Sequence, residues 1–94
     1  VVQGHTYDKF YGTPLDLSLR SQGITHIVAT GITTDVCVSG TVISGTTRDY
    51  RVTLATDGVA SPFPDLHKAA PKLLAHKFAR LKTCEELIDE LTSF

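Results

Sequence analysis

The chain has 94 residues, of which 41% are hydrophobic and 20% are charged, and its formal net charge is −1 at pH 7. This size and composition are typical of one small folded domain and exclude an intrinsically disordered chain. The near-neutral charge excludes the basic surface that nucleic acids and anionic membranes attract, so we expect neither partner. The apolar runs are too short for a membrane span or a signal peptide.

The residue inventory also bears on the origin of the chain. Its two cysteines, Cys37 and Cys84, are far apart and form neither a C-x-x-C pair nor a disulfide framework. Free thiols favour a reducing compartment, so we expect a cytoplasmic location. The sequence contains no methionine and opens in an apolar pair, Val1–Val2, that is typical of the end of a strand. We therefore expect a part of a longer or processed polypeptide.

The first predicted elements are a helix and a buried strand. Residues 13–16, TPLD, start the helix with a capping threonine, a proline at the first helical position and an acidic residue. Leu15 and Leu19 share one face of this helix, and Gly23 ends it. Residues 24–31, ITHIVATG, form a short apolar run that closes on glycine and predicts a buried strand.

The last part of the chain again alternates strand and helix. Residues 51–59, rich in β-branched side chains, predict a strand, and residues 77–81 predict a shorter one. A helix is expected over 65–76, where Pro71 predicts a kink or a broken start. The capping box 83–86, TCEE, opens a final helix. The apolar faces are expected to hold Leu66, Ala69, Ala70, Leu73 and Leu74 in the first helix and Leu87, Ile88 and Leu91 in the second.

Residues 34–49 are the most difficult segment to interpret. Their threonines and valines, together with Gly40 and Gly45, make a poor helix by propensity. A strand there would leave no crossover between parallel strands, so we predict a buried helix whose small residues permit close packing. The alternation of strands and helices then predicts an α/β fold, a three-layer Rossmann-like arrangement with a parallel sheet flanked by helices on both faces.

Residues 30–41, TGITTDVCVSGT, place Cys37 in the first turn of this helix, directly after a strand. Ligands of α/β proteins bind at this edge of a parallel sheet. The unpaired N–H groups at a helix start lower the pKa of a thiol and stabilise an oxyanion, an arrangement suited to attack on a carbonyl. The alternative is a packed core cysteine, since free cysteine is often buried. A cysteine phosphatase loop is excluded, because Ile43 stands where that loop needs arginine.

Three segments carry a family resemblance: YDKFYGTPL (7–15), TGITTDVCV (30–38) and RDYRVTLATDG (48–58). Together with the closing FARLKTCEELIDEL, they resemble the C-terminal half of the isochorismatase-like cysteine hydrolases, which include nicotinamidases and ureidoacrylate amidohydrolases. The resemblance implies that residues 1–94 form that half of a single domain and that Cys37 is the nucleophile. It also implies an oxyanion hole made by the backbone N–H groups of Thr33 and Cys37, and a cis peptide bond between Ile32 and Thr33.

The resemblance also implies features around the nucleophile. Tyr7 and Phe10 would line the active-site pocket, although the aromatic cluster is equally compatible with a hydrophobic plug before the first helix. The family lysine would fall at Gly4, and the family aspartate, the general base, belongs to the first strand of the fold, outside these residues. Lys9 stands where the family usually has a small residue, so we do not assign it the lysine's role.

The remaining polar residues receive structural interpretations. The Asp-x-His pair through which nicotinamidase-type members bind zinc is absent, so we predict no metal and no other cofactor. His26 is expected to be a packed core histidine, whereas His67 and His76 are expected at the surface. The others are Asp35, expected to cap the helix N-terminus, Asp57, expected in a turn, and Cys84, expected to be structural.

These observations predict a hydrolase that cleaves a C–N bond of a small amide or ureido substrate through a cysteine acyl-enzyme. The loss of lysine at Gly4 favours an alternative, a catalytically silent family member that serves as a binding or assembly subunit. A third interpretation is a vinyl-ether hydrolase, whose best-known members lack the cysteine. The expected partners are the small substrate, an N-terminal half and further copies in a homodimer or homotetramer. Since the central strands of the family sheet (order 3-2-1-4-5-6) would be missing, we expect no independent folding.

Overall fold

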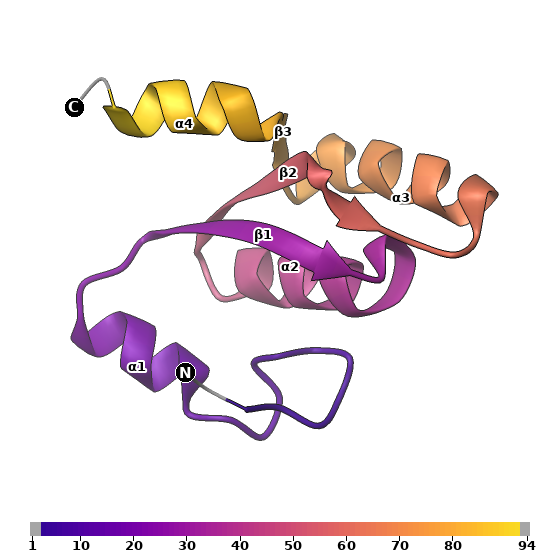
Figure 1. Cartoon of the computed structure of the whole chain (residues 1–94). Helices are drawn as coiled ribbons and strands as arrows, with labels where there is room; N and C mark the ends of the chain where they lie inside the picture. The colour runs from indigo at the N-terminus through magenta and orange to yellow at the C-terminus, as the bar shows by residue number, and fades with distance from the viewer. Residues whose placement is uncertain (1–2, 93–94) are drawn as a thin grey trace.

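Three parallel strands form the centre of the fold, in the order β1-β2-β3 (Figure 1). β1 spans His26–Ile32, β2 spans Arg51–Ala60 and β3 spans Arg80–Lys82. The structure is a computed structural model that describes residues 3–92. The strand predicted at Val1–Val2 lies outside the described residues.

Helical segments precede, connect and follow the strands, so the α/β class and the parallel sheet predicted from the sequence are confirmed. The segment after β1 is helical as predicted, but it begins with a π-helical turn, η1, that continues directly into an α-helix. The helical segments are α1 (Leu15–Ser21), η1 (Thr34–Val38), α2 (Ser39–Thr47), α3 (Pro64–Lys77) and α4 (Cys84–Thr92).

Helices cover both faces of the sheet, as predicted. Val42 of α2 and Leu74 of α3 pack into one core cluster with Leu54 of β2. Side chains alternate along a strand, so Thr53 of β2 faces the opposite side, where it lines a cavity together with Leu87 of α4. Figure 1 shows α4 and α2 well separated, with the strands between them.

The core lies between the sheet and the helices on the α2 side. Gly45 allows α2 to pack closely against the rest of this core. A Cβ atom added at Gly45 of α2 would lie 3.4 Å from the Phe10 ring and 3.4 Å from Val52. This agrees with the prediction that the small residues of the segment allow close approach. The buried members of the cluster are Phe10, Val38, Val42, Tyr50, Val52, Leu54, Val59 and Leu74.

The predicted helix boundaries rest on observed caps. The Thr13 hydroxyl accepts a hydrogen bond from the Leu15 N–H at 3.3 Å, and Gly23 after α1 has a φ of 70°. In the capping box before α4, the Thr83 N–H donates to the Glu86 carboxylate at 3.0 Å. The Glu86 N–H donates back to the Thr83 hydroxyl at 3.1 Å.

The prediction of a buried strand after α1 is wrong for this structure. Val28 is 50% exposed and Ile32 is 72% exposed, because β1 pairs only with β2 and no described element covers its outer side. The outer side of α4 is also uncovered among residues 3–92, so Ile88 and Leu91 are exposed although Leu87 is buried.

α3 also differs from its prediction. It is continuous from Pro64 to Lys77 through Pro71, so the broken start is absent, and the next strand begins later than predicted, at Arg80. Its buried face holds Ala70 and Leu74. Leu66, Ala69 and Leu73, which were predicted on that face, are exposed instead. Within residues 3–92, no helix combines the length and the apolar character needed to cross a lipid bilayer.

Candidate active site

The backbone turns sharply where β1 ends. The peptide bond between Ile32 and Thr33 is cis, at the position that the family resemblance indicated. Thr33 is extended, with φ −98° and ψ 147°. Its carbonyl oxygen accepts hydrogen bonds from the N–H groups of Val36 at 3.3 Å and Val38 at 3.1 Å. These two bonds wind η1 immediately after the strand.

Cys37 lies in η1 and is neither fully buried nor fully exposed. It lines a cavity of about 230 Å³ together with side chains of β1 and the start of α2. The thiol is therefore not enclosed in the core cluster, which favours a reactive role over the packed alternative. The lining residues are Lys9, Ile27, Val28, Ala29, Thr30, Cys37, Val38 and Thr41.

Lys9 is the one lysine or arginine among the residues that line this cavity. Its backbone N–H donates to the hydroxyl of Thr41, on the helix that follows the nucleophile turn, at 3.1 Å. Its ammonium group donates to the Thr6 carbonyl at 2.8 Å. A Cβ atom at Gly4 would lie 3.5 Å from the Lys9 Cδ, so the Lys9 stem passes the position where the family lysine would begin.

The other residues expected at the site lie apart from this cavity. Thr33 is half-buried and does not line it. Tyr7 is 68% exposed and lines a neighbouring cavity with Asp35. Phe10 is 4% exposed and stacks on Tyr50, with ring centroids 5.7 Å apart. Lys9 and Cys37 thus line the same cavity, and Phe10 lies in the core as a plug, the alternative that the sequence left open.

Asp35 does not cap the helix as expected. The N-cap position is Thr33, which makes no side-chain cap hydrogen bond, and its carbonyl oxygen already engages the Val36 and Val38 N–H groups. The Oδ1 atom of Asp35 is buried and has no hydrogen-bond partner within residues 3–92.

The histidines occupy other environments than the sequence indicated. His26 is exposed at the start of β1, where Nδ1 lies 3.0 Å from the Thr25 hydroxyl, so the prediction of a core histidine is wrong. His67 is not a free surface residue, because its Nδ1 lies 2.8 Å from the hydroxyl of the fully buried Thr34. His76 is exposed, as predicted.

A periodic signal could have identified His67. It stands three residues before Ala70 and seven before Leu74, the two buried residues of α3. Positions i, i+3 and i+7 share one face of a helix, so His67 belongs to the inward face. The predicted apolar face already held Ala70 and Leu74 beside Leu66, Ala69 and Leu73, but His67 was expected at the surface because it is polar.

Asp57 and Cys84 form a helix cap. β2 continues through Asp57 to Ala60, so the predicted turn is absent. The Asp57 carboxylate accepts a hydrogen bond from the Cys84 N–H at 2.7 Å, and this bond lowers the pKa of Asp57. The hydrogen bond to Asp57 raises the pKa of the Cys84 thiol. A raised pKa disfavours the thiolate, which is the nucleophilic form of a cysteine.

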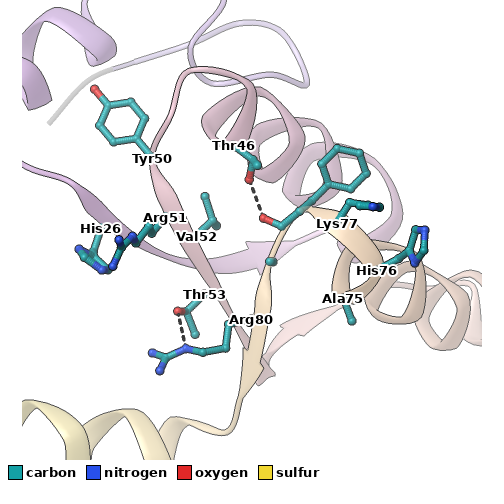
Figure 2. A pocket seen from close by; sticks show the side chains of 12 residues that line it. His26, Thr46, Tyr50, Arg51, Val52, Thr53, Ala75, His76, Lys77 and Arg80 are labelled. Carbon is teal, nitrogen blue, oxygen red and sulfur yellow. Dashed lines mark hydrogen bonds between the residues drawn. The ribbon is translucent and has the colours of Figure 1, made fainter.

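The opposite edge of the sheet, where the strands start, carries a larger cavity of about 580 Å³ (Figure 2). Arg80 there is paired with the Glu90 carboxylate at 2.8 and 2.9 Å and also contacts Thr53. Figure 2 shows His76 and Lys77 on the far side of the cavity from the other basic groups, so the cations do not converge. Basic side chains in the lining are His26, Arg51, His76, Lys77 and Arg80.

No metal cluster is found in the described part of the chain. Within residues 3–92, no three side chains of the types His, Cys, Asp and Glu lie close enough to share a metal ion. The candidate site is the Cys37 cavity at the carboxyl edge of β1. Its elements are a thiol on a strand-to-helix turn, a cis peptide bond before that turn and a lysine at the cavity.

The fold is a parallel α/β fold with a cysteine on the turn after β1, and comparison with known proteins identifies the family. The isochorismatase domain model matches residues 1–86, so the chain belongs to the isochorismatase domain family. Over 65 residues, the chain is 45% identical to ureidoacrylate amidohydrolase RutB of Methylobacterium radiotolerans. The matched region covers 68% of this chain and 25% of that protein.

Two solved structures show the same fold. A cysteine hydrolase from Pseudomonas syringae pv. phaseolicola superposes with a TM-score of 0.93 at 27% identity, covering 98% of this chain and 48% of that one. The nicotinamidase from Staphylococcus aureus superposes with a TM-score of 0.84 at 33% identity, covering 86% of this chain and 53% of the nicotinamidase. The chain thus spans about half the length of these structures and a quarter of the amidohydrolase.

Proposed function

We propose that this chain carries the nucleophile of a hydrolase that cleaves a C–N bond in a small amide or ureido substrate. The observation that carries the proposal is the placement of Cys37, which lies on the turn after β1 and lines a cavity that also holds a lysine. The amide chemistry is supported by the ureidoacrylate amidohydrolase and the nicotinamidase among the similar proteins.

In this proposal the Cys37 thiolate attacks the substrate carbonyl, and a C–S bond forms. The backbone N–H groups of Thr33 and Cys37 stabilise the oxyanion of the tetrahedral intermediate. Collapse of the intermediate breaks the C–N bond, and the protonated nitrogen leaves as ammonia or an amine. Water then attacks the acyl-enzyme and releases the acid and the free thiol.

Two further parts complete the proposed machinery. The general base, an aspartate in the family, comes from an N-terminal half, either in the same polypeptide or as a separate piece. The cation that favours the thiolate is Lys9, because a positive charge near a cysteine stabilises the charged nucleophile. Gly4 has no side chain, and the Lys9 stem passes beside it. We call this chain joined to its N-terminal half the assembled enzyme.

A specific observation favours the second candidate, a catalytically silent subunit. The Lys9 ammonium group bonds to the Thr6 carbonyl, and the position of the family lysine is Gly4. A member without a working lysine could still bind a small ligand in the Cys37 cavity. The two candidates differ in whether the bound substrate is turned over.

The test is hydrolysis of a panel containing ureidoacrylate, nicotinamide and biuret by the assembled enzyme, with release of ammonia as the readout. We expect turnover of at least one substrate, loss of that turnover in Cys37→Ser, and retention in the matched control Cys84→Ser. Binding without turnover in the wild type would support the silent subunit. Equal turnover by Cys37→Ser and wild type would overturn both the nucleophile and the acyl-enzyme.

A further inference from the structure

Thr34 is the fully buried polar residue of the nucleophile turn. Its exposed fraction is 0%, and its hydroxyl lies 2.8 Å from Nδ1 of His67. Its carbonyl oxygen accepts a hydrogen bond from the Ser39 hydroxyl at 2.5 Å. Burying a hydroxyl group without a hydrogen-bond partner costs free energy, and the imidazole of His67 supplies that partner for Thr34.

The imidazole comes from a different layer of secondary structure. His67 lies in the first turn of α3, where its backbone N–H bonds to the Phe63 carbonyl at 2.9 Å. Its partner Thr34 is 33 positions away in sequence. Among the side-chain hydrogen bonds of residues 3–92, this is the one that joins α3 to η1. The bond therefore ties the nucleophile turn to the helix packed against it.

Thr34 lies between the two groups that are proposed to act on the substrate, so its hydrogen bond affects the geometry of the site. Thr34 directly follows Thr33, whose N–H is a proposed oxyanion donor, and precedes Cys37 in the same turn. If the Thr34 hydroxyl were released, the turn would keep the bonds to the Thr33 carbonyl but lose its one side-chain hydrogen bond to α3 among residues 3–92. A displacement on the order of 1 Å at such a site is enough to cost a large part of a catalytic rate.

We propose that His67 is a positioning residue for the Cys37 site and acts through Thr34. The imidazole Nδ1 and the buried Thr34 hydroxyl share this hydrogen bond. This holds η1 in the orientation in which Cys37 and the Thr33 N–H face one carbonyl group. The inference rests on the proposed hydrolase function, and it adds a residue outside the cavity to the machinery.

The experiment compares variants of the assembled enzyme by kcat, KM and the rate at which iodoacetamide alkylates Cys37. In His67→Ala we expect kcat to fall about tenfold, the rate equivalent of one such hydrogen bond, with KM nearly unchanged. The exposed histidine on the same helix supplies the matched control, His76→Ala, which should behave as wild type. His67→Asn should recover activity because its amide occupies the δ position, whereas His67→Gln should not.

A double-variant cycle separates positioning from general stability. Thr34→Val removes the hydroxyl and keeps the shape of the side chain, and Thr34→Ser keeps the hydroxyl. If His67 acts through Thr34, the double variant His67→Ala with Thr34→Val loses no more kcat than either single variant. If His67→Ala does not fold, His67→Gln and Thr34→Val carry the same comparison.

Failure of the inference is distinguishable from failure of the proposed function. Equal kcat in His67→Gln and wild type, or full additivity in the cycle, would overturn the positioning role while leaving the hydrolase intact. If the wild type hydrolyses no amide, the proposed function fails. The alkylation rate of Cys37 then still reports on the geometry of the nucleophile turn. Equal alkylation rates in wild type and Thr34→Val would overturn the inference.

Discussion

At the scale of single residues, Lys9 is the one lysine or arginine that lines the Cys37 cavity. In the assembled enzyme, Lys9→Gln should lower the rate of Cys37 alkylation at pH 7 about tenfold, because the thiolate loses its favourable neighbouring charge. Lys9→Arg should preserve most of the rate. Lys72→Gln, on the exposed surface of α3, is the matched control. An unchanged alkylation rate in Lys9→Gln would remove Lys9 from the site and favour the silent subunit.

The sequence was informative about residues whose role is local. The position of Cys37 after a strand follows from a contiguous motif, and the structure has Cys37 on the turn after β1. The family resemblance implied the cis bond before Thr33, which the structure also has. Phe10 and His67 were harder to interpret, because their partners are distant in sequence. Phe10 stacks on Tyr50, and His67 bonds to Thr34. Such contacts follow from tertiary packing and leave little trace in local spacing.

At the scale of secondary structure elements, Asp57 of β2 anchors the start of α4. The Cys84 N–H holds the pKa of Asp57 below its ordinary value of 3.8. A carboxyl group whose folded-state pKa is depressed stabilises the fold above its ordinary pKa, and this stabilisation is lost as the pH falls through the folded-state value. Asp57→Asn should therefore flatten the loss of stability of the assembled enzyme between about pH 5 and pH 2.

The measurement is chemical denaturation at a series of pH values, with Asp65→Asn as an exposed control on α3. Wild type and the control should lose stability in parallel as the solution is acidified. If Asp57→Asn follows the same curve as wild type, the cap contributes no measurable pH dependence and the assignment of Asp57 is wrong.

The elements themselves show which physical signals a sequence carries. The helix after β1 and the capping box at Thr83 were predictable, because crossover connections and caps are local rules. The late start of β3 was not, because Pro71 does not interrupt α3 and the helix continues to Lys77. The exposure of β1 was not predictable either, since it depends on which element lies beside the strand.

At the scale of the whole molecule, the described residues leave apolar surface on two sides. Ile32 of β1 is 72% exposed and Leu91 of α4 is 68% exposed. Exposed apolar faces and an unpaired strand edge do not offset the conformational entropy lost on folding. We therefore predict that residues 1–94, expressed alone, show no cooperative unfolding transition as a monomer. Calorimetry measures this, and adding the N-terminal half should restore a single transition.

A cooperative transition of the isolated monomer would contradict this prediction. Its observation would mean that the sheet β1-β2-β3 and its helices hold enough core to fold alone. The proposed need for an N-terminal half in folding would then fail. The separate proposal that this half supplies the general base would stand, because it concerns chemistry and not stability.

The most direct test of the central claim is intact-protein mass spectrometry of the assembled enzyme quenched in acid during turnover. The account predicts an adduct with the mass of the substrate acyl group, located by proteolysis to the peptide that contains Cys37. The adduct should decay with water as the acid product appears, and it should be absent in Cys37→Ser. Product formation without any such adduct, or with an adduct on Cys84, would contradict Cys37 as the nucleophile.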